Sequence, residues 1–351
     1  MDMAETRKLK AGIIGATGYT GIELVRLLVG HPDVEIALLT SRSYAGQPFS
    51  MVFPSFSGIV DLELSGNDHI HSRVEDIDVL FLALPHGLSA KMLQEISYRS
   101  RVVIDLGADF RLKNKLDYEV WYDLQHPFPK ALKEAVYGLP ERHREQIKKA
   151  KLIANPGCYA TASELALLPL ASAGLLQDPI IDAKSGVSGA GRSVNLDTLY
   201  NEVNENLKAY KVAGHRHTPE IEQELSEAAG QPIKITFTPH LIPMQRGILV
   251  TAYCPVPDGH NLDSVMALYK DFYEKEPFVR VLDIESAQTR FVRGSNYCDI
   301  ALKEDTRTGR LIVTSALDNL IKGAAGQAIQ NMNLACNLDE RAGLAPVPQF
   351  L

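Results

Sequence analysis

The chain has 351 residues, of which 45% are hydrophobic and 23% are charged. This length predicts about two domains of ordinary size, and the composition excludes collagen-like, coiled-coil and disordered chains. The formal net charge of −7 argues against nucleic acid and anionic membranes as partners, because both attract basic proteins. An anionic substrate would have to be bound by local arginine and lysine side chains.

The first 155 residues alternate strand-like and helix-like segments. Continuous apolar runs predict buried strands at 10–14, 34–40, 79–84 and 101–106. Between the first two runs, the segment 22–29 places its apolar residues on one helical face, and the Gly-His-Pro sequence at 30–32 ends it. Strands that alternate with helices indicate a parallel sheet covered by helices, which is an α/β domain.

The character of the sequence changes after residue 155. The segment 160–170 predicts a helix in spite of Pro169, and longer strands are expected at 233–238, 247–254 and 311–316. A glycine-rich loop, GVSGAG, lies at 186–191, and a helix rich in Ala, Gln and Asn is expected at 319–336. These segments indicate a second domain that mixes helices and strands, followed by a final helix.

The cysteines and the first ten residues indicate the cellular compartment of the protein. The four cysteines contain no C-x-x-C pair and are too few for a disulfide scaffold, which favours a reducing compartment. The first ten residues carry charges and no apolar signal-peptide core, and the apolar run 79–85 is too short to span a bilayer. We therefore expect a cytoplasmic protein.

The motif GATGYTG (15–21) directly follows the first strand and opens the first helix. This placement predicts a dinucleotide-binding loop, in which glycines let the backbone approach a pyrophosphate bound at the helix N-terminus. A tight turn without a ligand is the alternative. The residues expected to bind the cofactor are Gly15, Thr17, Gly18, Tyr19, Thr20 and Gly21.

The end of the second strand indicates which nicotinamide cofactor binds. A carboxylate at this point binds the ribose 2′-hydroxyl of NAD, whereas a basic residue accepts the 2′-phosphate of NADP. The strand ends in Thr40, Ser41 and Arg42, while Glu35 is expected at its start and directed away from the cofactor. Ser41 and Arg42 therefore predict NADP(H); a solvated surface charge is the alternative for Arg42.

Cys158 follows Asn-Pro-Gly at the expected N-terminus of a helix. This position lowers the pKa of a thiol, because helix amides and the macrodipole favour the thiolate. The same amides can serve as an oxyanion hole. A thiolate beside a nicotinamide indicates thioester chemistry. The alternative, a buried and inert thiol, is assigned to Cys254, Cys298 and Cys336.

The segment IANPGCYATASELALLP (153–169) closely resembles the active-site signature of the N-acetyl-γ-glutamyl-phosphate reductase family, which acts in arginine biosynthesis. Gly107 stands where this family often has serine before Ala-Asp-Phe-Arg. The resemblance covers nearly the whole chain through GATGYTG (15–21), GADFRL (107–112), SGVSGAGR (185–192), GHRHTPE (214–220), TPHLIPMQRGI (238–248) and DNLIKGAAGQA (318–328). The wider group includes aspartate-semialdehyde dehydrogenase and resembles glyceraldehyde-3-phosphate dehydrogenase in architecture.

This resemblance implies three parts of the chain. A Rossmann NADP-binding domain is expected at 1–155, an α+β catalytic and oligomerisation domain at 156–318, and a C-terminal helix at 319–351 that returns to the Rossmann domain. The expected partners are a small-molecule acyl-phosphate substrate and further copies of the chain, in a homodimer or homotetramer.

The acid–base group is expected in GHRHTPE (214–220). Its His-Thr pair matches the His-Ser pair of the aspartate-semialdehyde group, so His217 is expected to exchange a proton with the catalytic Cys158. His215 is the other candidate, and we expect it to orient the loop and bind substrate. No third ligand motif accompanies these two histidines and the chemistry requires no metal, so no metal site is expected.

An acyl phosphate requires cationic partners. Arg111 lies in a motif that resembles the phosphate-binding arginine region of the wider group, and Arg192 and Arg246 are further candidates. For each arginine, an ion pair between two segments is the alternative. The remaining cofactor contacts are expected from Pro85 and His86, which follow the third strand, from Ser188 and Gly189, and from Asn319, which resembles the asparagine that binds the nicotinamide amide in related dehydrogenases.

The residues and the resemblance together imply NADPH-dependent reduction of N-acetyl-γ-glutamyl phosphate to N-acetylglutamate 5-semialdehyde, through a thioester on Cys158. A related reductase that acts on a carrier-protein-linked substrate is one alternative, against which the Asn-Pro-Gly turn argues. A non-catalytic NADP(H) sensor would be free to lose Cys158 and His217. A thiol hydrolase or acyltransferase would need no dinucleotide loop.

Overall fold

The computed structural model describes residues 7–66, 70–344 and 347–350, which cluster into two compact units. Unit 1 runs to Lys113 and includes His126–Asn155 and Ala325–Leu344. Unit 2 holds Asn114–Gln125, Pro156–Ala324 and the described part of the C-terminal segment. The segments 114–125 and 347–350 thus cluster with unit 2, although they lie in the first and third parts expected from the sequence.

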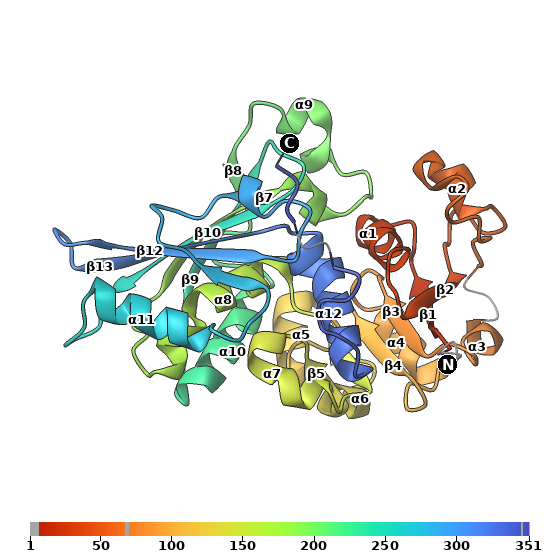
Figure 1. Cartoon of the computed structure of the whole chain (residues 1–351), viewed down its shortest axis with the longest axis horizontal. Helices are drawn as coiled ribbons and strands as arrows, with labels where there is room; N and C mark the ends of the chain where they lie inside the picture. Colours follow the sequence, from red (N-terminus) through yellow and green to blue (C-terminus); the bar gives the residue numbers. More distant parts are fainter. Residues whose placement is uncertain (1–6, 67–69, 345–346, 351) are drawn as a thin grey trace, which may run out of the picture. The chain divides into compact units, whose positions relative to one another are not determined.

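Unit 1 is built on six parallel strands in the order β2-β1-β3-β4-β6-β5 (Figure 1). The central strands β3 and β4 are buried along their whole length, as in sheets covered on both faces. The strands predicted from the first four apolar runs are confirmed, and β5 and β6 are additional. The bounds are β1 (Leu9–Ile14), β2 (Val34–Leu39), β3 (Val79–Leu82), β4 (Val102–Asp105), β5 (Val136–Tyr137) and β6 (Leu152–Ala154).

The strand order of unit 1 reverses at β1, whose neighbours are β2 and β3. Open α/β sheets bind ligands beyond the carboxyl ends of the strands at such a switch point, and the glycine loop 15–21 follows β1 there. The predicted helix after the loop is confirmed as α1 and begins earlier than expected, at Tyr19. The helices of unit 1 are α1 (Tyr19–Leu28), α2 (Phe49–Val52), α3 (Ile70–Arg73), α4 (Ser89–Glu95), α6 (Pro129–Glu134), α7 (Pro140–Ile147) and α12 (Gly326–Ala335), with the 3₁₀ turn η1 (Pro54–Phe56).

Helix α12 belongs to unit 1 and contributes a row of buried amide side chains. The side-chain amide of Asn331 donates to the carbonyl oxygen of Gly138 (2.8 Å) and to Oδ1 of Asn155 (3.1 Å). The ring Nε2 of His31 lies 3.0 Å from Oδ1 of Asn333. The final helix was predicted at 319–336, but its α-helical part begins only at Gly326, after the π-helical turn η5 (Ile321–Ala325).

Unit 2 is built on a mixed seven-stranded sheet with the order β11-β12-β13-β10-β7-β9-β8. Along β10, buried and half-buried residues alternate, because successive side chains point to opposite faces. The strands predicted at 247–254 and 311–316 are confirmed as β10 and β13, and the one predicted at 233–238 begins later, as β9. The bounds are β7 (Ile180–Gly186), β8 (Lys208–Ala209), β9 (Thr236–Ile242), β10 (Ile248–Pro255), β11 (Val279–Val281), β12 (Cys298–Asp305) and β13 (Arg310–Leu317).

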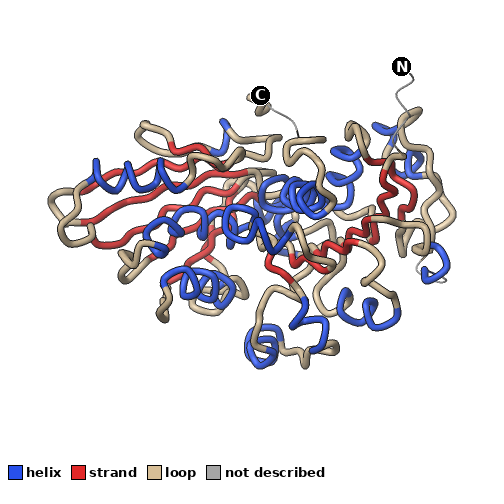
Figure 2. Tube along the Cα trace, turned by 60° about the horizontal axis from the view of Figure 1, so that its bottom comes forward, coloured by secondary structure: helices blue, strands red, loops and turns tan. Residues whose placement is uncertain are grey.

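Helix α8 is the central helix of unit 2 and packs on β10, β13 and α10; the helices alongside the long strands are seen in Figure 2. Almost every one of its residues is buried, which explains why its sequence is apolar on all sides. None of the helices in the described part of the chain combines the length and apolar character that a membrane span requires. The helices of unit 2 are α5 (Lys115–Tyr122), α8 (Cys158–Ser172), α9 (Tyr200–Val203), α10 (Thr218–Ala229) and α11 (Leu262–Phe272), with the 3₁₀ turns η2 (Val187–Ala190), η3 (Leu196–Thr198) and η4 (Thr289–Phe291).

The helix predicted in spite of Pro169 is confirmed, and the structure shows how the proline is accommodated. Proline has no N–H, so the carbonyl of Leu165, four residues earlier, loses its helical partner. The hydroxyl of Tyr273 donates to this carbonyl (2.6 Å), and the hydroxyl of Tyr269 donates to the carbonyl of Ala166 (2.7 Å). Two tyrosines at the end of α11 therefore satisfy the backbone around the break.

Gly21 provides a test of the tight packing between the glycine loop and α1. A Cβ at this position would lie 2.7 Å from Cα of Ala16, closer than real Cβ atoms approach backbone. We expect Gly21→Ala to lower the free energy of unfolding by about 1–2 kcal/mol, because overpacking outweighs the higher helix propensity of alanine. Denaturant unfolding measures this change. The matched control is Gly30→Ala, where the nearest atom would be 3.9 Å from the new Cβ; equal unfolding midpoints for the two variants would contradict the expectation.

Candidate active site

The glycine loop of unit 1 is tied to the end of β2. Gly15 has a φ of +86° and its amide donates to Oγ1 of Thr40 (3.2 Å), while the hydroxyls of Thr17 and Ser41 lie 2.9 Å apart. Ser41 is buried and Arg42 is exposed. Glu35 is the second residue of β2, near its start as expected.

The start of α1 suits a bound anion. Its N-cap residue is Gly18, which has no side chain to cap the helix, so no N-cap side chain covers the first-turn amides. A cradle of small residues before an uncapped helix N-terminus fits the pyrophosphate of a dinucleotide. In this part of the loop Tyr19 is exposed and Thr20 is half-buried.

Pro85 and His86 are exposed in the loop between β3 and α4. The buried carboxylate of Asp109 holds this loop, because its two oxygens accept the amides of Gly87 (2.6 Å) and Ala90 (2.9 Å). Asp109 was not singled out from the sequence. Its contacts indicate that it fixes the loop on which the two expected cofactor contacts lie.

Arg111 is buried with 8% of its surface exposed. Its Nε donates to the carbonyl of Asn155 (2.8 Å) and its terminal nitrogen donates to the carbonyl of Leu106 (3.0 Å). These carbonyls follow β6 and β4, so Arg111 joins the ends of two strands. Its expected contact with the substrate phosphate stays a prediction.

Cys158 begins α8, with Gly157 as the N-cap residue, and its side chain is half-buried. The helix macrodipole favours negative charge at this end, and a partly exposed thiol is accessible for reaction. The amide of Gly157 donates to Oε1 of Glu220 (2.7 Å), a fully buried residue of α10. This contact joins the cysteine turn to the segment that carries the two histidines.

The imidazole rings of His215 and His217 both pack against the ring of Tyr159. The ring centroid of Tyr159 lies 5.7 Å from that of His215 and 6.0 Å from that of His217, and the hydroxyl donates to the carbonyl of His240 (2.9 Å). His217 is the N-cap residue of α10 and makes no side-chain capping hydrogen bond. The neighbours of Cys158 on both sides in the sequence therefore contact the predicted acid–base segment.

His215 differs from His217 in its surroundings. Its ring packs against the aromatic rings of Tyr159, Tyr210 and Phe237, and its Nδ1 accepts the backbone amide of His217 (3.1 Å). Burial, with the nearby charges of Lys211 and Arg216, lowers the pKa of His215 to about 3. His215 is therefore neutral near neutral pH, and its Nδ1 is free of a proton to accept the backbone amide of His217. Its expected role in orienting the loop stays a prediction.

Gly323 lies against Cys158. A Cβ on Gly323 would lie 2.8 Å from Cβ of Cys158. The amide of Gly323 donates to the carbonyl of Asp318 (3.0 Å), five residues earlier, within the π-helical turn η5. Such turns are frequent at functional sites, and this one brings a residue without a side chain next to Cys158.

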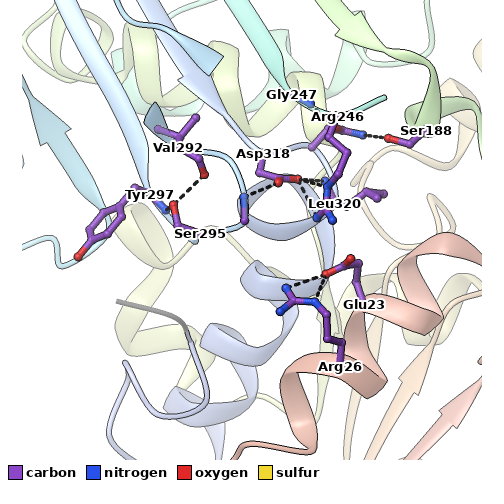
Figure 3. Close-up of polar contacts among 12 residues, drawn as sticks. Glu23, Arg26, Ser188, Arg246, Gly247, Val292, Ser295, Tyr297, Asp318 and Leu320 are labelled. Carbon is purple, nitrogen blue, oxygen red and sulfur yellow. Dashed lines mark hydrogen bonds and ion pairs between the residues drawn. The ribbon is translucent and has the colours of Figure 1, made fainter. Parts of the chain in front are cut away.

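Three of the predicted residues, Ser188, Arg246 and Asn319, come together in unit 2. Figure 3 shows the first two of them. The side chain of Asn319 donates to Oγ of Ser188 (3.0 Å) and accepts the amide of Gly247 (2.7 Å). Arg246 forms an ion pair with the fully buried Asp318 (3.1 Å). The sequence does not predict a role for Asp318. It lies 72 residues from Arg246, and no motif links two residues at that separation.

The other predicted residues of unit 2 are more exposed. Gly189 and Arg192 are exposed, and a Cβ on Gly189 would lie 3.2 Å from Oγ of Ser185. The three remaining cysteines show the features expected of inert thiols. Cys298 is buried, and burial raises the pKa of Cys254 and of Cys336 to about 11.

Glu220 ends the motif GHRHTPE (214–220), but it is not among the residues predicted for the site. A glutamate three residues after the start of a helix is the signal of a capping box, and this signal was present. The arrangement as a whole places a thiol at a helix N-terminus together with two imidazoles and a buried carboxylate. Such a group can form and break a covalent bond to an acyl carbon.

The low pKa of His215 predicts how stability depends on pH. Below pH 6.5 the histidine binds a proton in the unfolded chain and stays neutral in the folded protein, so its contribution to stability falls as the pH drops toward 3. In His215→Asn, the side-chain oxygen replaces Nδ1 as acceptor and does not titrate. Between about pH 7.5 and pH 5, we expect the free energy of unfolding of this variant to fall by about 2 kcal/mol less than that of the parent. Urea unfolding measures the slopes. The exposed His260→Asn is the control; parallel slopes for the parent and the His215 variant would refute the assignment.

Two family models match the chain. The model of the semialdehyde dehydrogenase NAD binding domain matches residues 10–150, and that of the semialdehyde dehydrogenase dimerisation domain matches residues 158–319. Among solved structures, aspartate semialdehyde dehydrogenase II of Vibrio cholerae, complexed with ASA, covers 95% of this chain and 99% of its own with a TM-score of 0.72 and 18% identity. The aspartate semialdehyde dehydrogenase of Candida albicans, with NADP, covers 93% of this chain and 98% of its own, with a TM-score of 0.68 and 17% identity. These structures show the fold.

Curated relatives are similar in sequence over nearly the whole chain. The N-acetyl-gamma-glutamyl-phosphate reductase of Heliobacterium modesticaldum is 55% identical over 96% of this chain and 98% of its own length. The protein of the same name from Campylobacter jejuni is 51% identical over 96% and 98%. The chain therefore belongs to the N-acetyl-gamma-glutamyl-phosphate reductase family.

Proposed function

We propose that this protein reduces N-acetyl-γ-glutamyl phosphate to N-acetyl-L-glutamate 5-semialdehyde, with NADPH as reductant and phosphate as the second product, in arginine biosynthesis. The observation that carries the proposal is the half-buried Cys158 at the N-terminus of α8, whose two neighbours contact the segment of His217 and Glu220. The names of the relatives supply the substrate.

Cys158 and His217 perform the covalent steps. His217 accepts the thiol proton, and the thiolate attacks the acyl carbonyl carbon, so that a C–S bond forms while the C–O bond to phosphate breaks. The thioester is then reduced to a hemithioacetal. Its C–S bond breaks to release the aldehyde, and His217 returns the proton to the sulfur. First-turn amides of α8 are suited to stabilise the oxyanion that develops in each step.

NADP(H), when bound, supplies or accepts the hydride. Residues of the glycine loop 15–21 would hold its pyrophosphate at α1, and Ser41 and Arg42 at the end of β2 would hold its 2′-phosphate. The loop with Pro85 and His86, and the cluster of Ser188, Gly189 and Asn319, are the further expected contacts.

Arginines hold the anionic groups of the substrate. Arg246 is the candidate best supported, because the buried Asp318 fixes its guanidinium while a fifth of its side chain stays exposed. Arg192 is exposed, and Arg111 is committed largely to backbone carbonyls. His215 acts on substrate binding through the orientation of its loop.

We also propose that the protein works as a homodimer or homotetramer in the cytoplasm. The match of residues 158–319 to a dimerisation domain supports the assembly. Within these residues, the segment 194–212 exposes large apolar side chains, among them Val194, Leu196, Tyr200, Leu207 and Val212. Such a concentration is typical of surfaces that a partner covers. The four free cysteines agree with a reducing compartment.

The activity is tested in the reverse direction, with semialdehyde, phosphate and NADP as reactants and NADPH absorbance as the readout. Cys158→Ser should lower the rate at least tenfold, because a serine hydroxyl stays protonated and is a far weaker nucleophile. NADPH binding should remain near normal. Cys336→Ser is the matched control and should keep the parental rate. Residual activity above about 10% in the Cys158 variant would rule out the thioester route.

Cofactor choice is tested at Arg42. Replacement by glutamate removes a charge-assisted phosphate contact and adds a repulsive charge, so NADPH affinity should fall about tenfold to a hundredfold while NADH affinity is maintained or rises. Fluorescence titration with both cofactors measures the change. Unchanged NADPH affinity would show that another residue binds the 2′-phosphate.

A further inference from the structure

Glu220 has no exposed surface, although it carries an ionisable side chain. It occupies the third position of α10, three residues after His217, which is the N-cap residue. Its Oε1 accepts the amide of Gly157 at 2.7 Å. Gly157 precedes Cys158 and is the N-cap residue of α8. One hydrogen bond therefore connects the first turns of the two helices that carry the nucleophile and the acid–base group.

The arrangement departs from an ordinary capping box. In that motif the glutamate at the third position reaches back to the amide of its own N-cap residue. Here the amide of His217 donates instead to Nδ1 of His215 (3.1 Å). His215 thus supplies a local acceptor for this amide, and the carboxylate of Glu220 accepts an amide from a turn that is 63 residues away in the sequence.

We propose that Glu220 is a positioning residue for the reaction, which holds the Cys158 sulfur at a fixed place relative to the imidazole of His217. Proton transfer between these groups requires their heavy atoms to lie within about 3 Å or to share one water. Glu220 and His217 lie in the same rigid first turn of α10, so the bond to Gly157 sets this distance. The inference rests on the proposed function, because it assigns Glu220 to the same covalent steps.

Three substitutions of Glu220 distinguish the effect of its hydrogen bond from the effect of its charge. Glu220→Gln keeps an oxygen acceptor of the same reach, Glu220→Asp keeps the charge but is shorter by one methylene, and Glu220→Ala removes both. The matched control is Glu224→Ala, which removes another fully buried carboxylate one turn later in α10.

We expect Glu220→Ala and Glu220→Asp to lower kcat about tenfold to a hundredfold, with KM changed by less than about threefold, because misplacement of the reacting groups acts on the chemical step. Glu220→Gln should stay within about threefold of the parent, because its oxygen still accepts the Gly157 amide. The rate of Cys158 alkylation by iodoacetamide should follow the same order. Glu224→Ala should lose stability but keep kcat and the alkylation rate.

Several results would overturn the proposal. These are an unchanged kcat in a folded Glu220→Ala variant, a Glu220→Gln variant as slow as Glu220→Asp, or an equal loss of kcat in Glu224→Ala. If Glu220→Ala does not fold, the comparison of the Asp and Gln variants decides. Alkylation requires neither substrate nor cofactor. It therefore tests Glu220 even if the parent fails to reduce the acyl phosphate, a failure that would count against the proposed function alone.

Discussion

The turn 155–157 has to place a cysteine at the start of a helix that is buried on all sides, and its own polar groups must find partners there. Arg111 donates to the carbonyl that precedes the proline, Asn331 donates to the side-chain oxygen of the same residue, and Glu220 accepts the following glycine amide. A buried polar group left without a partner costs about 1–3 kcal/mol. The polar groups of the turn therefore find their partners on residues from three distant segments of the chain.

Much of the fold could be predicted, because its core elements have one clear pattern. The strand at 79–82 is a continuous apolar run, and α8 is apolar on all sides. Such patterns predict complete burial from the sequence alone. The strands β7 and β12 mix apolar with charged residues and gave no such signal. The π-helical turn before α12 gave no signal either, and it contains the contact between Gly323 and Cys158, which only the folded chain creates.

The site could be predicted where chemistry is local. A cysteine after Pro-Gly and a glycine loop after a strand indicate, through their neighbours in the sequence, the roles that we propose for them. The partners that orient these residues do not. Arg111 reaches a carbonyl 44 residues away, and Arg246 reaches a carboxylate 72 residues away. Such pairs depend on the order of strands in a sheet, so the arginines were recognised as cations while their binding partners were not.

The proline of α8 has a consequence for how unit 2 assembles. A continuous apolar helix offers its neighbours a smooth surface, against which a second helix can settle in several positions of nearly equal energy. Pro169 leaves one backbone oxygen without its partner, and the two hydroxyls at the end of α11 reach the oxygens at this point. A shift of α11 by a single turn would leave the Leu165 carbonyl and both hydroxyls without these partners in an apolar interior. The break at Pro169 thus selects one docked position of α11, and α8, the helix that begins at Cys158, gains a unique alignment from a residue that looks unfavourable in the sequence.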